Sequence, residues 1–354
     1  MALEPENVLT TFKQVTPKWL TRVLSENGLL KHGKVISVEN ILTKTLPLSV
    51  VSRLVVTYSS DFNAPSQILL KISSHACPQG NGREVEFYRT VGREMNAPPL
   101  IRCYDAAYAA ESGRSHLLLE DLSETHLQPK SPLPPRPLHC ELAVECLAEF
   151  HASWWGHPQL GKEIGALFSE KELRVFLTEV EKNVLRFIDF LGDQLSVKRR
   201  KIYDRLLASK GKIWGHLTNA HGLTVTHGDA HWWNLLYPRD VGKHRVCLFD
   251  WQLWHVDLGP RDLAFMVALG GYSERMAAQE RNLVRRYYDS LTAHGVRNYT
   301  WDDCWSDYRW SALRNLNVPA IQWLQGKSTD LWRSNLERAM LAYDELRCFE
   351  LLDD

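Results

Sequence analysis

The sequence lacks the features that mark several specialised classes of protein. Its seven cysteines are scattered, odd in number and never spaced Cys-x-x-Cys, which excludes a disulfide framework or a zinc ribbon as the organising element. It carries no surplus charge, with 42 basic and 42 acidic residues, so no overall field attracts it to nucleic acid or to an anionic membrane. It also shows no internal repeat.

Long apolar runs are missing as well. No stretch approaches the roughly 18 apolar residues of a membrane-spanning helix. The first residues, Met-Ala-Leu-Glu-Pro-Glu, lack the basic segment and apolar core of a secretion signal. We therefore expect a cytoplasmic protein whose partner is a small molecule, with no membrane or nucleic acid among its partners.

What is present indicates two domains. A chain of 354 residues with 44% hydrophobic and 24% charged residues is typical of a globular protein larger than one small core. A proline-rich connector at 129–137 separates a β-rich first part from a helical remainder. The first part predicts a helix that begins at Pro17 and is ended by Gly28, an antiparallel meander of strands over 35–41, 50–58 and 67–72, and two further strands over 103–109 and 115–119. Beyond the connector, apolar spacing predicts helices over 143–154, 169–192 and 197–207.

The chemistry is concentrated between Thr224 and Trp254. A strand over 223–226 leads into His-Gly-Asp at 227–229, Asn234 follows five residues after the aspartate, and a second apolar strand over 245–249 ends on Asp250. We expect these polar groups to converge at the ends of adjacent strands. Upstream, Lys71 lies on a predicted strand between apolar neighbours, where a charged group needs a partner.

These residues together fit phosphoryl transfer. That reaction needs a cation to hold the phosphates, ligands for Mg²⁺, and a carboxylate that orients the attacking hydroxyl. Asp229 is the candidate acceptor for the hydroxyl proton, and Asn234 and Asp250 supply the hard oxygens that Mg²⁺ prefers. Lys71, held by Glu84 on the following helix, would steady the phosphates of ATP. Each signal is weak alone, and their order and spacing carry the information.

The order matches the kinase signature set, with glycine in place of arginine in the His-Arg-Asp loop. The sequence resembles the aminoglycoside phosphotransferase and choline kinase-like family, including its ecdysteroid kinase-like members, through His227-Gly-Asp-Ala-His-Trp-Trp-Asn234 and Phe249-Asp-Trp-Gln252. The resemblance implies an α+β protein kinase-like fold of two lobes, a β-rich N-terminal lobe with an antiparallel sheet and a mostly helical C-terminal lobe. It implies a nucleotide-binding lobe over 1–122, with a hinge at about 117–123, and a catalytic and acceptor-binding lobe over 123–354.

The resemblance also implies roles for further residues. Asp229 becomes the catalytic aspartate and Asn234 and Asp250 the Mg²⁺ ligands, while Asp262, in Gly-Pro-Arg-Asp-Leu-Ala, supports the catalytic loop. The family pattern favours Glu84 over Glu86 as the partner of Lys71. Adenine would bind the backbone of the hinge, at Glu120, Asp121 and Leu122. The expected phosphate-covering segment at 44–49 has no glycine, and Ser49 is its candidate contact.

Two other functions fit part of the pattern. A metal-dependent hydrolase would use His227, Asp229 and His231, a trio that also suits a transition metal. A nucleotide-binding scaffold without catalysis would use the same lysine and aspartates. An ATP-dependent kinase that phosphorylates an alcohol accounts for more of the residues than either.

The acceptor is not encoded in a recognisable motif. The chain is rich in tryptophan, with thirteen residues, and Trp232, Trp233, Trp251 and Trp254 fall within the catalytic segment. Tryptophan faces bind apolar surfaces and organic cations, although a place in the core is the commoner role for each one. The hypothesis from the sequence is an aromatic-rimmed pocket for a hydroxylated molecule of apolar or quaternary-amine character.

Overall fold

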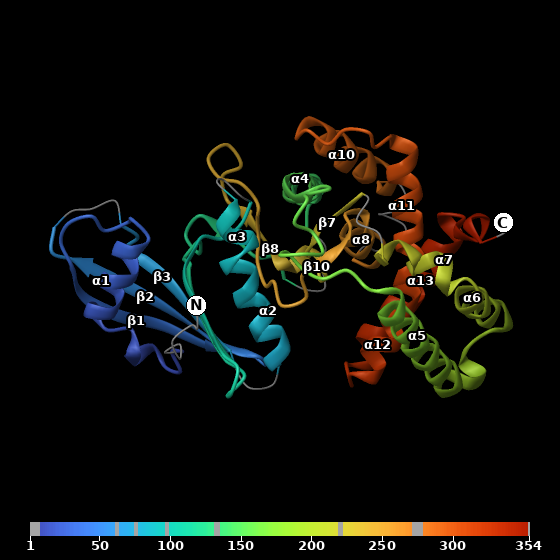
Figure 1. Cartoon of the computed structure of the whole chain (residues 1–354), viewed down its shortest axis with the longest axis horizontal. Helices are drawn as coiled ribbons and strands as arrows, with labels where there is room; N and C mark the ends of the chain where they lie inside the picture. The colour runs from blue at the N-terminus through green and yellow to red at the C-terminus, as the bar shows by residue number, and fades with distance from the viewer. Residues whose placement is uncertain are drawn as a thin grey trace. The chain divides into compact units, whose positions relative to one another are not determined.

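A computed structural model describes residues 8–60, 64–73, 77–95, 99–130, 135–218, 222–270 and 279–352. The chain forms two compact units (Figure 1). The first unit consists of Met1–Gln128 and Leu236–Trp254, and the second consists of Pro129–Leu235 and His255–Asp354. Part of the proline-rich connector, 131–134, lies outside the described residues.

The first unit is built on a five-stranded antiparallel sheet in the order β1-β2-β3-β5-β4. Consecutive strands β1, β2 and β3 pair as a meander because only short turns connect them, as the sequence predicts. The five strands are Val35–Thr45, Ser49–Tyr58, Gln67–Ser73, Cys103–Ala109 and Arg114–Glu120.

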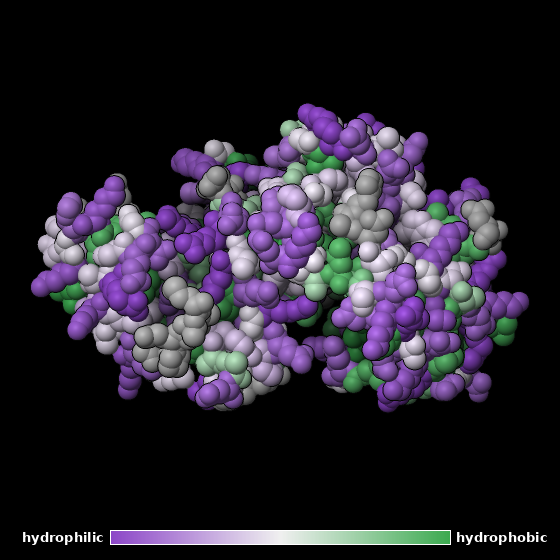
Figure 2. Space-filling view, in the orientation of Figure 1, coloured by the Kyte–Doolittle hydropathy of each residue, from purple (hydrophilic) through white to green (hydrophobic). Residues whose placement is uncertain are grey.

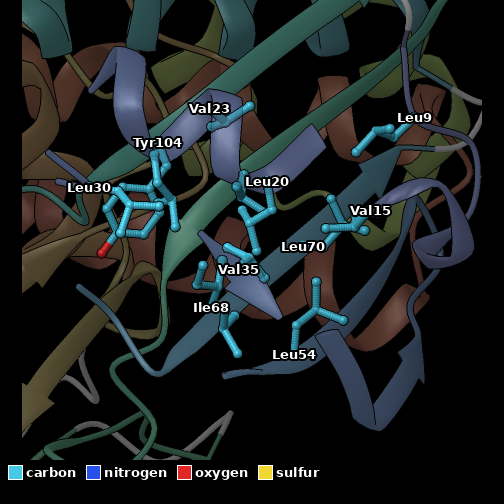
Figure 3. Packing of buried hydrophobic residues seen from close by; sticks show 13 residues of the cluster. Leu9, Val15, Leu20, Val23, Leu30, Val35, Leu54, Ile68, Leu70 and Tyr104 are labelled. Atoms are coloured by element: carbon cyan, nitrogen blue, oxygen red, sulfur yellow. The ribbon is translucent and has the colours of Figure 1, made fainter. Parts of the chain in front are cut away.

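One face of this sheet is covered by helix α1, Pro17–Glu26 (Figure 1). The helix begins where the Thr16 hydroxyl accepts a hydrogen bond from the Trp19 N–H at 3.2 Å, and it ends shortly before Gly28, whose φ of 71° favours glycine. The helix thus ends close to Gly28, as the sequence predicts. Its apolar face packs on the sheet, and the core there includes Leu20, Val23, Leu54, Ile68 and Leu70 (Figure 3).

Helix α2, Pro78–Arg89, follows β3 and packs on strands β4 and β5. The unit also contains a three-stranded sheet in the order β6-β8-β9, formed by His126–Leu127, Leu235–Pro238 and Cys247–Leu248. The last strand is shorter than the five residues predicted from apolar character, because only two of its residues make ladder contacts.

The second unit is mostly helical. Helix α5 shows how closely the sequence determines its ends: the Ser169 hydroxyl accepts from the Glu172 N–H at 3.2 Å, and the Glu172 carboxylate accepts from the Ser169 N–H at 2.8 Å. The major helices are α4 Pro137–Trp154, α5 Glu170–Leu191, α6 Val197–Ala208, α10 Glu280–Ala293, α11 Trp301–Arg314 and α13 Thr329–Glu345.

Two short strands of the second unit position the polar loop. Strand β7, Leu223–Thr226, is buried throughout and pairs with β10, His255–Leu258, in an antiparallel ribbon. The sequence-based expectation of adjacent strands ending at His-Gly-Asp and at Asp250 is wrong, because β7 pairs with β10 while β9 belongs to another sheet.

On the face shown in Figure 2, hydrophilic residues cover most of the surface and hydrophobic residues form small groups. Among the described residues, none of the helices combines the length and the apolar character needed to cross a membrane. All seven cysteines are free thiols.

Candidate functional site

An ionic cluster in the first unit joins three predicted site residues. Lys71 on β3 donates from its Nζ to both oxygens of Glu84 on α2, each at 2.8 Å, and to the Oδ1 of Asp250, also at 2.8 Å. The side chains of Lys71 and Glu84 are 15% and 3% exposed, whereas that of Asp250 is 38% exposed. Asp250 is therefore the member of the cluster that is open to an incoming ligand.

The cluster remains charged at neutral pH. Burial opposes the charge of the ammonium group, but the Glu84 and Asp250 carboxylates more than offset this and raise the pKa of Lys71. Burial also raises the pKa of the Glu84 carboxyl, and Lys71 acts in the opposite direction. Because one ammonium contacts two carboxylates at short distance, we take the ion-paired form as the state of the cluster.

The backbone at Asp250 is held in an uncommon conformation. Its φ of 70° lies in the left-handed region, which residues with a side chain seldom adopt. The following residues are anchored to α2: the Trp251 ring stacks on Phe87 with 3.8 Å between centroids, and the Trp254 Nε1 donates to the Arg83 carbonyl at 2.7 Å. Helix α2 thus supplies Glu84 and also fixes the segment that carries Asp250.

Glu84 and Glu86 have clearly different surroundings. Glu84 is buried and bonded to Lys71, whereas Glu86 is exposed on the opposite side of the same helix. Two positions along a helix place side chains about 200° apart, so only one of the two can face the sheet. The geometry selects Glu84.

The residues predicted to form the hinge lie in a turn after β5 that is stabilised by hydrogen bonds. Asp121 accepts from the Arg53 Nε at 2.6 Å and from the Ser123 N–H at 2.9 Å, and the Leu122 carbonyl accepts from the His126 N–H at 2.8 Å. Glu120 ends strand β5 and its N–H donates to the Arg102 carbonyl at 2.9 Å.

The predicted phosphate-covering segment is a tight turn between β1 and β2. Ser49 is the first residue of β2, it is buried, and its carbonyl accepts from the Leu46 N–H at 2.8 Å. A hairpin turn of this kind satisfies its own backbone groups, so the hydroxyl of Ser49 is the part of the residue that remains as a candidate for phosphate contact.

In the second unit, β7 leads directly into His227-Gly228-Asp229. Gly228 has a φ of 79°, so the glycine is required for the turn that presents Asp229. The amide of Asn234 donates to the Asp229 carbonyl at 3.0 Å and to its carboxylate at 3.3 Å. Because the amide nitrogen faces Asp229, the amide oxygen of Asn234 is the atom oriented to serve as a ligand.

Asp262 fixes this loop from within the core. Its carboxylate accepts from the backbone N–H groups of His227 at 2.5 Å and Gly228 at 3.0 Å, and it contacts His151 at 3.2 Å. Burial alone would raise the pKa of the Asp262 carboxyl, but the hydrogen bond from His151 and the backbone donors lower it below its usual value. The ring of His151 also contacts the Tyr287 hydroxyl at 2.7 Å.

A buried ion pair behind the β7–β10 ribbon was not predicted from the sequence. Arg314 on α11 forms two hydrogen bonds with Asp257 on β10, at 2.8 and 2.6 Å, and His216 and His255 contact the same carboxylate at 3.1 and 3.2 Å. Asp257 and Arg314 are 57 residues apart, so no local pattern could reveal the pair.

Most of the tryptophans between Thr224 and Trp254 pack in the core. Trp232 and Trp251 are 0% exposed and Trp254 is 2% exposed, while Trp233 is half-buried, with its ring 5.6 Å from that of His231. The hypothesis that these residues rim an acceptor pocket is therefore wrong for Trp232, Trp251 and Trp254, which are buried. Large aromatic side chains at strand ends are buried because they remove the largest apolar area from water.

The described residues contain no group of three or more His, Cys, Asp or Glu side chains that could hold a metal ion. The Nε2 of His231 lies 3.7 Å from the Asp229 carboxylate, and the Nδ1 of His227 accepts from the Asp229 N–H at 3.3 Å. His227 is thus engaged within the loop, and the trio needed for a hydrolase of the zinc type is not assembled.

Solved structures of small-molecule kinases share this fold. A Ralstonia eutropha JMP134 protein classed as an aminoglycoside phosphotransferase aligns with a TM-score of 0.54 at 13% identity, covering 93% of this chain and 98% of that one. Choline kinase from Cryptosporidium parvum Iowa II gives 0.52 at 13% identity, covering 90% of each chain. Amicoumacin kinase gives 0.51 at 13% identity, covering 92% of each. The predicted protein kinase-like fold is confirmed.

The family follows from the sequence itself. The family model described as ecdysteroid kinase-like matches residues 83–297, more than half of the chain. The chain belongs to the ecdysteroid kinase-like family. The matched span includes Glu84, Asp229, Asn234 and Asp250, whereas Lys71 precedes it. A comparison with curated proteins finds no match.

Proposed function

We propose that the protein is an ATP-dependent kinase that transfers the γ-phosphoryl group to a hydroxyl of a small molecule. The observation that carries this proposal is the Lys71 ammonium held between Glu84 and Asp250. A buried lysine with two carboxylate partners is a fixed positive charge, and Asp250 is its partly exposed partner. Membership of a kinase-like family supports the same reading.

In the proposed reaction Lys71 binds phosphate oxygens of ATP, and Glu84 keeps the ammonium in place. The phosphate oxygens would compete with Asp250 for the Lys71 ammonium. The Asp250 carboxylate would then be available to bind a metal ion. Residues 1–122 act as the nucleotide lobe, with Glu120, Asp121 and Leu122 receiving adenine along their backbone and the Ser49 hydroxyl contacting phosphate.

The ligand set suits Mg²⁺. The exposed carboxylate of Asp250 and the amide oxygen of Asn234 are hard oxygen ligands, and Mg²⁺ commonly binds through one or two protein oxygens together with phosphates. When bound, the ion would neutralise charge on the transferred phosphoryl group.

Asp229 acts on the acceptor. Its side chain is 35% exposed, and the hydrogen bonds of Asn234 and the turn at Gly228 fix its position. A fixed carboxylate can orient the hydroxyl and accept its proton as the bond to phosphorus forms. Residues 123–354 then act as the catalytic and acceptor-binding lobe.

The acceptor is proposed to be a hydroxylated small molecule of apolar or quaternary-amine character. Among the tryptophans of the catalytic segment, only the half-buried Trp233 retains a position from which its ring could contact such a molecule. A panel of choline, aminoglycosides, sugars, macrolides and steroid-like alcohols, assayed with Mg-ATP and ADP release, tests both parts of the proposal.

The outcomes of this assay are distinct. Phosphorylation of any alcohol supports the kinase, and selection of a polar sugar over all apolar alcohols contradicts the proposed acceptor class. Hydrolytic turnover without ATP that depends on Zn²⁺ or Mn²⁺ would replace the kinase with a hydrolase. If ATP binds but is neither used for phosphoryl transfer nor slowly hydrolysed, the protein is a nucleotide-binding scaffold.

Replacing Glu84 is expected to impair nucleotide use far more than replacing Glu86. Glu84→Gln removes the charge that holds Lys71, and the loss of a hydrogen bond to a charged group corresponds to a decrease of about 10- to 100-fold in kcat/KM for ATP. Glu86→Gln changes only an exposed side chain of the same helix, and steady-state kinetics should give a value close to that of the wild type. Equal effects of the two substitutions would contradict the assigned role of Glu84.

A further inference from the structure

The second unit contains a cavity of about 750 Å³ that the proposed reaction does not use. Its lining includes Trp155 and Gly156 after the end of α4, Gly222 before β7, and Leu258 at the end of β10. Asp229 follows the other end of β7. Because four strand residues span about 13 Å, the cavity lies at the opposite end of the ribbon from the loop that carries Asp229.

Aromatic rings form much of the lining. The rings of Trp155 and Tyr299 lie 4.7 Å apart between centroids, and Trp310 on α11 contributes a third ring. Ile213 and Leu258 add aliphatic surface. A concave site with several rings and a few polar groups is typical of a pocket for a small organic molecule.

The carboxylates of this cavity distinguish it from an ordinary packing defect. Asp303 and Asp307 lie one turn apart on α11 and both line it. The Asp307 carboxylate accepts from the Tyr299 hydroxyl at 2.9 Å, and no basic side chain of the described residues forms an ion pair with it. Burial raises the pKa of Asp307 to about 6, although the hydrogen bond from Tyr299 and the charge of His216 act in the opposite direction.

The basic residues of the lining have partners other than Asp307, and the Lys212 ammonium also lies 5.5 Å from the centroid of the Trp310 ring. The Lys212 Nζ donates to the Leu351 carbonyl at 3.1 Å, the Arg297 guanidinium donates to the Thr292 carbonyl at 2.9 Å, and the His216 Nε2 contacts Asp257 at 3.1 Å. Each of these groups already satisfies a carbonyl or a carboxylate of the protein. None of these three groups forms an ion pair with Asp307, whose carboxylate is bonded to the Tyr299 hydroxyl.

We propose that this cavity is a second ligand site, separate from the catalytic loop, which binds a small organic amine in its ammonium form. The ammonium group pairs with Asp307, and the apolar part of the ligand lies against Trp155 and Tyr299. A cation beside aromatic rings and a carboxylate gains both cation–π attraction and a charge-assisted hydrogen bond. The site requires no phosphoryl transfer, so it stands independently of the proposed kinase activity.

A series of probes with one shape and different charges tests the site. Isothermal titration of the full chain with 2-phenylethylamine, 2-phenylethanol and 3-phenylpropanoate compares a cation, a neutral molecule and an anion that share a phenylethyl group. At pH 8 the amine should bind about tenfold more tightly than the alcohol, as one hydrogen bond to a charged group predicts, and the anion should bind most weakly. Equal affinity of amine and alcohol, or tighter binding of the anion, would overturn the proposal.

Substitutions on helix α11 locate the binding. Asp307→Asn keeps the size of the side chain and should weaken binding of 2-phenylethylamine about tenfold, whereas Asp302→Asn, an exposed position on the same helix, should leave it unchanged. Trp155→Leu should weaken binding of the amine and the alcohol together. A variant Asp307→Asn with unchanged amine affinity would refute the site.

Independence from the catalytic loop has its own measurement. The dissociation constant of 2-phenylethylamine should be the same in the wild type and in Asp229→Asn, because Asp229 lies at the opposite end of β7. An amine affinity that falls with Asp229→Asn and not with Asp307→Asn would place the probe at the catalytic loop and overturn the proposal.

Discussion

Asp229→Asn is expected to lower kcat by about 10²- to 10⁴-fold, the range lost when a general base is removed. Asparagine has the same shape and can still accept the hydrogen bond that Asn234 donates to the side chain, so the loop should keep its conformation. The dissociation constant of AMP-PNP, measured by titration, should stay near that of the wild type, because nucleotide binding is assigned to Lys71 and Glu84.

Asp240→Asn is the matched control for this substitution. Asp240 lies between β8 and β9, is exposed, and contacts the nearby Lys243 ammonium at 3.5 Å and the Gly242 N–H at 3.0 Å, so kcat for the best acceptor of the panel should be unchanged. A loss of kcat for Asp229→Asn smaller than about tenfold would remove the carboxylate from the proton-accepting role. A parallel loss of nucleotide affinity would assign it to binding instead.

Arg314→Met is expected to lower the free energy of unfolding by about 3–5 kcal/mol, the cost of leaving one member of a buried ion pair alone. Asp257 is 0% exposed and its pKa is held well below the usual range: burial opposes this shift, but Arg314, His216 and His255 more than compensate. Loss of Arg314 leaves a buried carboxylate whose remaining partners are the His216 and His255 imidazoles and the Leu258 N–H, none of which carries a fixed positive charge. Urea unfolding followed by circular dichroism measures the change.

The contribution of the Asp257–Arg314 ion pair to the free energy of unfolding should depend on pH in a defined direction. A carboxylate whose pKa is lower in the folded state adds stability at pH values above its unfolded pKa of about 3.9, and this stability is lost as the pH falls toward the folded pKa. The difference in the free energy of unfolding between wild type and Arg314→Met should therefore be largest at pH 7 and decrease in acid. A difference that grows as the pH falls would contradict the pairing.

An exposed pair provides the control for the buried one. Lys198 and Asp344 contact each other at 2.6 Å with side chains 72% and 44% exposed, and Lys198→Met should change the free energy of unfolding by no more than about 1 kcal/mol. In the double variant Asp257→Asn, Arg314→Met, no uncompensated charge remains at this position. The double variant should lose less free energy of unfolding than the two single variants lose together, as expected for residues in contact.

The parts of the fold that the sequence predicts are those with a local cause. Alternating apolar residues place β1 to β5, and Ser169 with Glu172 defines the start of α5 because both halves of the capping box are within four residues. The pairing of Lys71 with Glu84 could also be anticipated, since a charged residue on a buried strand requires a partner and α2 follows that strand directly.

The parts that the sequence does not predict depend on distant contacts. Strand β9 has two residues and no periodicity, so nothing local states that β7 pairs with β10 instead. Burial of Trp232 and Trp251 depends on the elements that surround them, because tryptophan is suited equally to a core and to a ligand pocket. The Asp257 to Arg314 pair and the carboxylate at Asp307 become visible only when α11 is placed against the ribbon.

The buried position of Asp262 has a consequence for the exchange of amide hydrogens with solvent. Loop amides normally exchange through small local openings, but those of His227 and Gly228 are bonded to a carboxylate that is 1% exposed and that also contacts His151. Opening either bond uncovers a charge in the core, so these two amides belong with the slowly exchanging core strands. The loop from His227 to Asp229 is therefore kept ordered by the stability of the whole second unit and not by contacts within the loop alone.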